Sequence, residues 1–160
     1  MNGKRRRVSV RISLAAAFIG ALALAGCEAS CNVGDTPKAP AITKAEMGTG
    51  ASSNYEVQGA TTKFAPNTPK IFCVWKAEGI KANTPLRGVW IAEDVGTAAP
   101  ANYKIDEATL NLANANQGSF NLSKGEKDFP VGKYRVEIYI GNDLAKTVPF
   151  TIEEAQGGSQ

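Results

Sequence analysis

The chain contains no histidine among its 160 residues. That absence excludes the Ser-His-Asp and Cys-His catalytic arrangements, because both use an imidazole as the base. It also removes a common nitrogen ligand of zinc, so we expect no metal site and no cofactor. An enzyme of this composition would depend on carboxylates or lysines, without the side chain most often used in acid–base catalysis. We therefore expect a protein that is not an enzyme.

Acidic residues are missing from the first 27 positions, and residues 12 to 25 carry no charge of either sign. The eleven residues before that run hold five bases, at Lys4, Arg5, Arg6, Arg7 and Arg11. A basic segment followed by a short apolar run is typical of a secretory signal peptide. The run has 14 residues, and a membrane-spanning helix needs about 20. We favour a cleaved signal over a retained N-terminal anchor.

The apolar run ends in Leu24-Ala25-Gly26-Cys27. This motif resembles the lipobox of bacterial lipoproteins at all four positions. The resemblance implies that residues 1–26 are a lipoprotein signal peptide and that Cys27 receives a diacylglyceryl group, becomes the N-terminus and is acylated again, for example with palmitate. Several acyl chains would hold the chain on a lipid bilayer almost permanently. Glu28, in the position after the lipidated cysteine, favours the outer membrane over the inner membrane.

Removal of residues 1–26 would leave 13 of the 18 basic residues and all 15 acidic ones, a side-chain balance of −2. The basic character of the whole chain therefore belongs to the signal segment. Nucleic-acid binding calls for a basic patch on the working domain, so we expect no nucleic-acid partner.

Two cysteines would remain unmodified, Cys31 and Cys73. Export leads to an oxidising compartment, in which a disulfide between them can form. The alternative is that Cys73, which lies in an apolar stretch, is a buried free thiol. Both interpretations stay open on sequence alone.

Aromatic residues are absent between Cys27 and Asn54, whereas 11 of the chain's 12 lie from Tyr55 onward. Residues 27–53 are rich in Ala, Gly, Ser, Thr and Pro, a composition that buries too little apolar surface to offset its ordering entropy. We predict a lipidated cysteine with a disordered tether over 27–53. One β-sandwich domain then covers 54–153, and a disordered tail covers 154–160.

Apolar residues within this domain alternate with a period of two, which is typical of half-buried strands. In residues 133–140 the apolar Tyr134, Val136 and Ile138 alternate with polar neighbours. Pro149 has no amide donor, so the last strand should lie at an edge or carry a bulge. We predict seven short strands and an all-β sandwich; the strands cover 54–59, 70–78, 86–94, 102–112, 119–123, 133–140 and 144–152.

The corner formed by Pro130, Gly132 and Tyr134 resembles the one before the penultimate strand of immunoglobulin-like and fibronectin type III-like domains. The resemblance covers about residues 54–153. It implies that the Tyr134 hydroxyl bonds to upstream backbone and that Trp90 fills the core. The chain departs from antibody domains in lacking a cysteine in 133–140, so Cys73 should not form a bond across the core.

Three groups of residues are candidates for a ligand site. Trp75 and Trp90 could form a platform for a sugar, although tryptophans of small sandwiches usually fill the core. Tyr139 faces away from the Tyr134 side of its strand, so it is a candidate contact together with Trp75. Four acids near one loop, Glu93, Asp94, Asp106 and Glu107, could hold calcium or act in glycoside hydrolysis; solvated surface acids are the simpler interpretation, and we predict no catalytic residue.

The sequence therefore predicts a membrane-anchored, non-catalytic binding or accessory module of the bacterial cell envelope. Its partner would be an unidentified envelope protein or glycan, bound at a sheet edge or at the loops of one end. One alternative is a carbohydrate-binding or small glycan-hydrolysing domain, for which Trp75, Tyr139 and the acids would have to line one groove. Another is a structural spacer without a partner.

Overall fold

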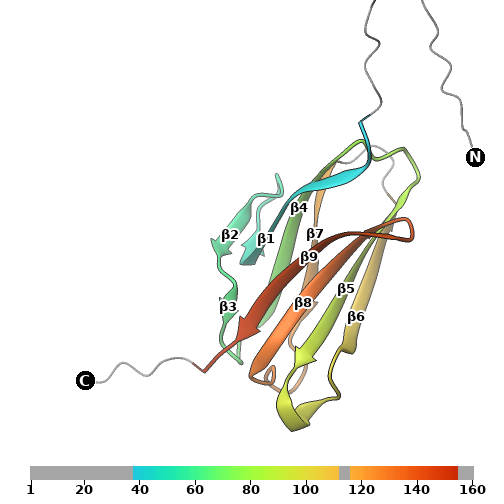
Figure 1. Cartoon of the computed structure of the whole chain (residues 1–160). Coiled ribbons are helices and arrows are strands. Elements are labelled where there is room, and N and C mark those ends of the chain that lie inside the picture. Colours follow the sequence, from blue (N-terminus) through green and yellow to red (C-terminus); the bar gives the residue numbers. More distant parts are fainter. Residues whose placement is uncertain (1–37, 112–115, 155–160) are drawn as a thin grey trace, which may run out of the picture. The chain divides into compact units, whose positions relative to one another are not determined.

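The computed structural model describes residues 38–111 and 116–154, which fold into two packed β-sheets (Figure 1). The four-stranded sheet has the order β2 (Val57–Ala60), β1 (Ala41–Ala51), β4 (Lys70–Glu78) and β7 (Gln117–Ser123). The five-stranded sheet has the order β3 (Lys63–Phe64), β9 (Asp143–Ile152), β8 (Gly132–Ile140), β5 (Pro85–Asp94) and β6 (Tyr103–Asn111). A short 3-10 turn, Gly96–Ala98, follows β5. The all-β prediction is confirmed.

All seven predicted strands are present, and 70–78 is matched by β4 from Lys70 to Glu78. The prediction for 54–59 is met only in its second half, because β2 begins at Val57. The expectation for Pro149 is also confirmed. Pro149 pairs with Arg135 of β8 on one side, whereas β3 reaches β9 only at Thr151 and Ile152. The missing amide of Pro149 therefore falls on a free stretch of edge.

The predicted tether is wrong for residues 41–51, which form β1. The sequence does not show this strand because only two of its large apolar side chains face the core, and a bulge between Ile42 and Lys44 interrupts the period of two. Ile42 and Met47 are buried. Backbone hydrogen bonds to both β2 and β4 also hold this strand in place. The two-residue strand β3 was also missed, because it is too short to show a period.

The predictions for residues 1–37 and 155–160 lie outside the described residues. They include the signal peptide, Cys27, Cys31, the first part of the tether and nearly all of the tail. Among residues 38–111 and 116–154, no helix is long and apolar enough to cross a membrane.

The core between the sheets is built from aliphatic and aromatic side chains, and no polar or charged residue is buried in the described part of the chain. Phe150 of β9 lies at its centre, with ring centroids 5.8 Å from Phe64, 5.9 Å from Trp90 and 5.2 Å from Tyr134. Tyr134, Val136, Ile138 and Ile140 are all buried, so the predicted alternation of β8 is confirmed.

The two sheets are aligned so that β5 stands over β7. A Cβ built on Gly88 of β5 would lie 2.5 Å from Cγ of Phe120 in β7. Only a glycine lets the two strands come this close. β6 is the edge strand next to β5. It therefore extends past β7, the edge strand of the four-stranded sheet, and has no strand of that sheet opposite it.

The ends of the sandwich differ in what they carry. β1 begins at the end where β4 finishes, since Ala41 pairs with Glu78. β9 finishes at the opposite end, where Ile152 pairs with Gly132 at the start of β8. The 95–102 and 124–131 loops share that second end (Figure 1). The chain therefore enters and leaves the sandwich at opposite ends.

Candidate functional site

Both tryptophans belong to the core. Trp90 is 1% exposed and Trp75 is 0% exposed, and the Trp75 ring lies 6.0 Å from that of Phe120. The prediction that Trp90 fills the core is confirmed, and Trp75 as a ligand contact is wrong. Both faces of 70–78 carry apolar residues, so the sequence alone did not show which face turns inward.

The tyrosine corner is confirmed. The Tyr134 hydroxyl donates to the carbonyl oxygen of Pro130 at 2.6 Å. Burial raises the pKa of Tyr134 to about 12, so the phenol remains protonated and able to donate. Gly132 precedes it because a Cβ there would lie 2.3 Å from the carbonyl oxygen of Asp94. This corner ties the start of β8 to the loop before it.

Cys73 lies on the core side of β4 and is 0% exposed. Burial raises the pKa of its thiol to about 12, so it is neither a nucleophile nor a ready metal ligand. Its postulated partner, Cys31, lies outside the described residues, and the disulfide stays a prediction.

The four acids of the proposed loop site point to different neighbours. Glu93 accepts from Arg135 at 3.0 Å, and Asp94 accepts the backbone amide of Gly96 at 3.1 Å. Asp106 accepts the amide of Glu107 at 2.8 Å, and Glu107 accepts from Lys104 at 3.1 Å. Within the described ranges, no three His, Cys, Asp or Glu residues are grouped closely enough to hold a metal ion. The acids do not form the groove that the glycan alternative requires.

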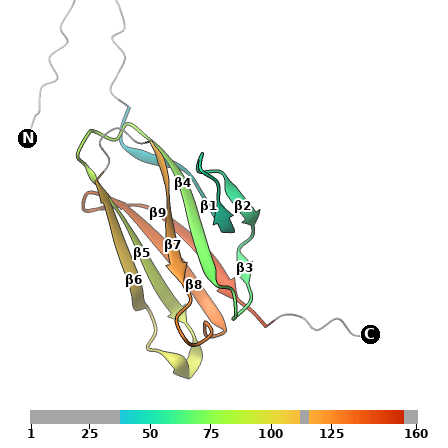
Figure 2. The same cartoon turned by 180° about the vertical axis from the view of Figure 1, so that it is seen from behind.

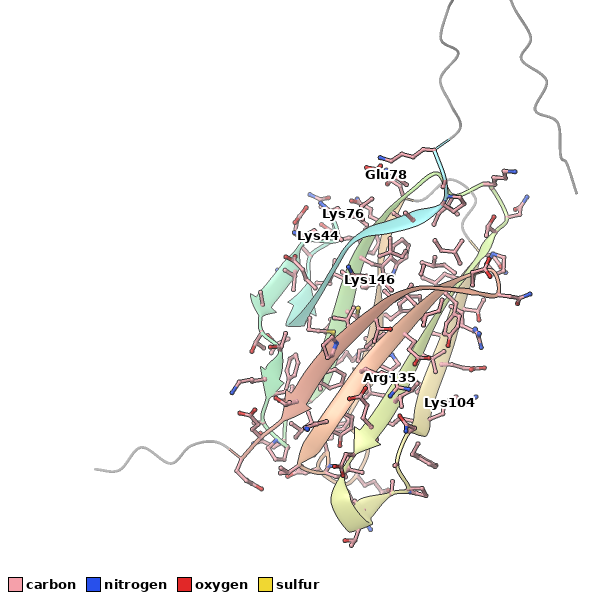
Figure 3. The ribbon with its side chains drawn as sticks, viewed as in Figure 1. Lys44, Lys76, Glu78, Lys104, Arg135 and Lys146 are labelled. Atoms are coloured by element: carbon pink, nitrogen blue, oxygen red, sulfur yellow. The ribbon has the colours of Figure 1, made fainter. Side chains whose placement is uncertain are left out.

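A polar and charged cluster lies on the outward face of the five-stranded sheet around Arg135 of β8, which Figure 3 labels. Nε of Arg135 donates to Glu137 at 2.7 Å, and Nη1 donates to Asn102 at 2.7 Å as well as to Glu93. The hydrogen bond to Glu137 is the main reason that the pKa of Arg135 is raised. We call Arg135, Glu137, Glu93 and Asn102 the Arg135 network. This network joins β8 to β5 and to the 95–102 loop. Sequence reasoning missed the network because Asn102 and Glu93 lie 33 and 42 residues from Arg135 in the chain.

Tyr139 lies on the same outward face and is half-buried. Its hydroxyl donates to Glu137 at 2.6 Å, and the Arg87 guanidinium carbon lies 4.5 Å from its ring centroid. Partial burial would raise the pKa of Glu137, but the hydrogen bonds from Tyr139 and Arg135 outweigh it and the pKa is lowered. The polar groups of Tyr139 are therefore already engaged within the sheet. Its role as a ligand contact stays a prediction.

A hollow of about 340 Å³ lies beside this network, lined by Lys63, Glu93, Lys133, Pro149 and Glu153 among others. Lys63 and Glu153 pair with each other at 3.2 Å across it. Hydrogen bonds from Thr151 and Lys63 lower the pKa of Glu153, which holds it as a carboxylate. Its two acids pair with bases. Tyr134 and Phe150 also line the hollow, but they are only 2% and 3% exposed, so neither offers an open ring face to a ligand.

Comparison with known proteins finds a similar solved structure. It is an immunoglobulin-like protein from Pseudomonas aeruginosa, with a TM-score of 0.50 and 19% identity, over 74% of this chain and 100% of that one. The fold is immunoglobulin-like. At this identity the similarity shows the fold alone. No protein-family model and no curated protein matches the chain.

The immunoglobulin-like order explains where the sandwich is open. The four-stranded sheet ends at β7, and the chain passes from β6 to β7 through only five residues, 112–116. β6 and β7 therefore bound one side of the sandwich, and β2 and β3 bound the other (Figure 2). The side bounded by β6 and β7, where each sheet has a long unpaired edge, is the remaining candidate for a binding surface.

Proposed function

We propose that the chain is a lipid-anchored, non-catalytic binding or accessory module of the bacterial cell envelope. The observation that carries the proposal is a lipobox-like motif, Leu24 to Cys27, placed just ahead of an immunoglobulin-like domain. An immunoglobulin-like domain is typically a binding or spacing unit, although fold alone does not assign function.

The position of β1 supports a domain held close to the membrane. Thirteen residues separate Cys27 from Ala41, and a fully extended chain of that length spans at most about 45 Å. The end that bears the start of β1 would then face the lipid, and the 95–102 and 124–131 loops would point away from it. Both long free edges, β6 and β7, would run away from the membrane and stay open to an envelope partner.

The use of the candidate acids supports a non-catalytic role. Glu93 and Glu107 are bound to bases of the same sheet, and Asp94 and Asp106 accept local backbone amides. The platform that the carbohydrate-binding alternative needed is absent from the described surface, because both tryptophans are buried. We therefore do not carry that alternative further. We place the module at the outer membrane because Glu28, rather than aspartate, follows Cys27.

The test is intact mass together with membrane fractionation of the wild type and of Cys27→Ala, produced in a bacterial host. We expect the wild type to lose residues 1–26, gain acyl mass and sediment with outer-membrane markers. The Cys27→Ala chain should carry no acyl mass. The matched control is Cys31→Ala, which should be acylated like the wild type. A wild type whose Cys27 is unmodified would overturn the anchor, and fractionation with inner-membrane markers would overturn the placement.

A further inference from the structure

The two long free edges of the sandwich are protected to different degrees. β6 carries a bulge opposite Trp90 and Ile91, and charges at Lys104, Asp106 and Glu107. β7 pairs with β4 in seven consecutive steps without a bulge, and its sequence QGSFNLS contains no charge and no proline. Proteins normally guard an exposed edge with bulges, charges or proline, because an unguarded edge invites pairing. β7 is thus a seven-residue edge strand whose free backbone groups can pair with another strand.

The backbone groups that β7 offers follow from its pairing. The Asn116 carbonyl accepts from Ala77 at 2.7 Å, and the Lys124 amide donates to Pro69 at 2.9 Å, so even-numbered residues point to β4. Because these groups alternate along an antiparallel strand, the amides and carbonyls of Gln117, Ser119, Asn121 and Ser123 point to the free edge.

β6 extends past the free edge of β7, and no strand of the described chain packs against the core side of β6 there. On the core side of β6, Tyr103, Asp106, Ala108 and Leu110 pair with Ala92, Trp90, Gly88 and Leu86 of β5. The β5 residues are covered by the other sheet, but Tyr103 is 52% exposed and Asp106 and Ala108 are exposed as well. β5 stands over β7, so the place beside β7 and beneath β6 holds no strand of the described chain (Figure 2). We call this place the vacant strand position.

We infer that the vacant strand position receives an extended segment of a partner protein, which pairs with β7 and packs beneath β6. This rests on the proposed function as a binding module and names its site. The segment would be at least seven residues long and free of proline where it pairs. Alternate side chains would be apolar, to cover Tyr103, Ala108 and Leu110. One basic side chain would face Asp106, which has no ion pair within the described ranges.

A second copy of this chain does not fit that position. If two β7 strands paired, the β6 of each copy would have to lie above the β7 of the other. In each copy, the place above β7 is already filled by that copy's own β5, whose Gly88 lies against Phe120. The β6 of one copy would therefore clash with the β5 of the other. A single extended segment meets no such obstacle.

Segments of this chain outside the described residues fit poorly too. β9 ends beside β3, on the side of the sandwich away from β6 and β7. At the other end, the chain enters through β1, three strand spacings or about 14 Å from the vacant strand position. Crossing that width takes about four extended residues. Of residues 28–37 about six would then remain, fewer than the seven of β7.

The test selects binders from a phage-displayed library of random dodecapeptides against the full mature chain, residues 27–160 with Cys27→Ala. We expect selected peptides to alternate apolar and polar residues. The strongest one, made synthetically, should slow hydrogen exchange at the amides of Ser119 and Asn121. Asn121→Pro removes an edge amide without touching the bonds to β4, and should weaken binding at least tenfold. The matched control Asn121→Ala keeps the amide and should change binding less than twofold.

A second variant tests packing beneath β6 independently of backbone pairing with β7. Tyr103→Ser removes an exposed side chain, so the fold should be kept while peptide affinity falls several-fold. The inference is overturned if no peptide is selected, if the best peptide is indifferent to both Asn121→Pro and Tyr103→Ser, or if the chain dimerises through β7. Acylation of Cys27 is measured separately. An acylated chain without β7-dependent binding overturns this inference alone, and an unmodified chain that binds through β7 overturns the anchor alone.

Discussion

The contact between Gly88 and Phe120 gives the sharpest test of how the sheets are aligned, and Gly88→Ala is the perturbation. A Cβ at this position would lie 2.5, 2.6 and 2.8 Å from three carbons of the Phe120 ring. Gly88 pairs with Ala108 and Ile138 in the middle of the sheet, so neither strand can easily move aside.

The expected magnitude follows from two opposing terms. Inserting a methyl group into a packed core costs about 1–3 kcal/mol. Replacing glycine by alanine in an ordinary backbone conformation gains about 0.4–1 kcal/mol through the unfolded chain. Gly88 has no positive φ, so that gain applies, and we expect a net loss of about 1–2 kcal/mol.

The assay is urea unfolding followed by tryptophan fluorescence. Gly88→Ala should lower the midpoint without changing the slope, and the melting temperature should fall by about 4 °C per kcal/mol. The control is Gly125→Ala, where a Cβ would meet nothing within 4 Å and stability should be unchanged or slightly higher. In a double-mutant cycle, Phe120→Leu should remove most of the penalty of Gly88→Ala, with a coupling of about 1 kcal/mol.

A Gly88→Ala chain as stable as the wild type would refute this reasoning, and so would a double mutant whose losses simply add. Either result would mean that β5 does not stand over β7. The overhang of β6, and the vacant strand position beneath it, would then be lost as well.

Two further predictions concern single side chains. Tyr134→Phe should lower the free energy of unfolding by about 1–3 kcal/mol, because the Pro130 carbonyl loses its donor; unchanged stability in urea would count against the corner. Cys73 should resist a maleimide in the native state at pH 8 and react once after unfolding, because it is 0% exposed and the pKa of its thiol is raised to about 12. Rapid native labelling at Cys73 itself would contradict its burial, and an unfolded, unreduced chain in which neither Cys31 nor Cys73 takes up the label would indicate the Cys31–Cys73 disulfide.

Sequence patterns were reliable where one local property decided the structure. β8 was foreseen because its apolar residues alternate without interruption, and the corner at Tyr134 was foreseen because its residues lie close together in the chain. β1 was not foreseen, because glycine and alanine carry no periodicity and the strand depends on pairing with β2 and β4. Of the candidate contacts, Trp75 failed because both faces of its strand are apolar and only packing selects one.

The sequence by itself determined the strands with period two, the tyrosine corner, the lack of imidazole chemistry and the lipobox-like motif, because each depends on residue type and on near neighbours. Only the tertiary structure decided which face of β4 is buried, which distant groups bind Arg135, and which edge is left unpaired. Those properties depend on residues 33 and 42 positions apart in the Arg135 network and on the alignment of two sheets. A register of this kind is set by packing across the core, which no local pattern records.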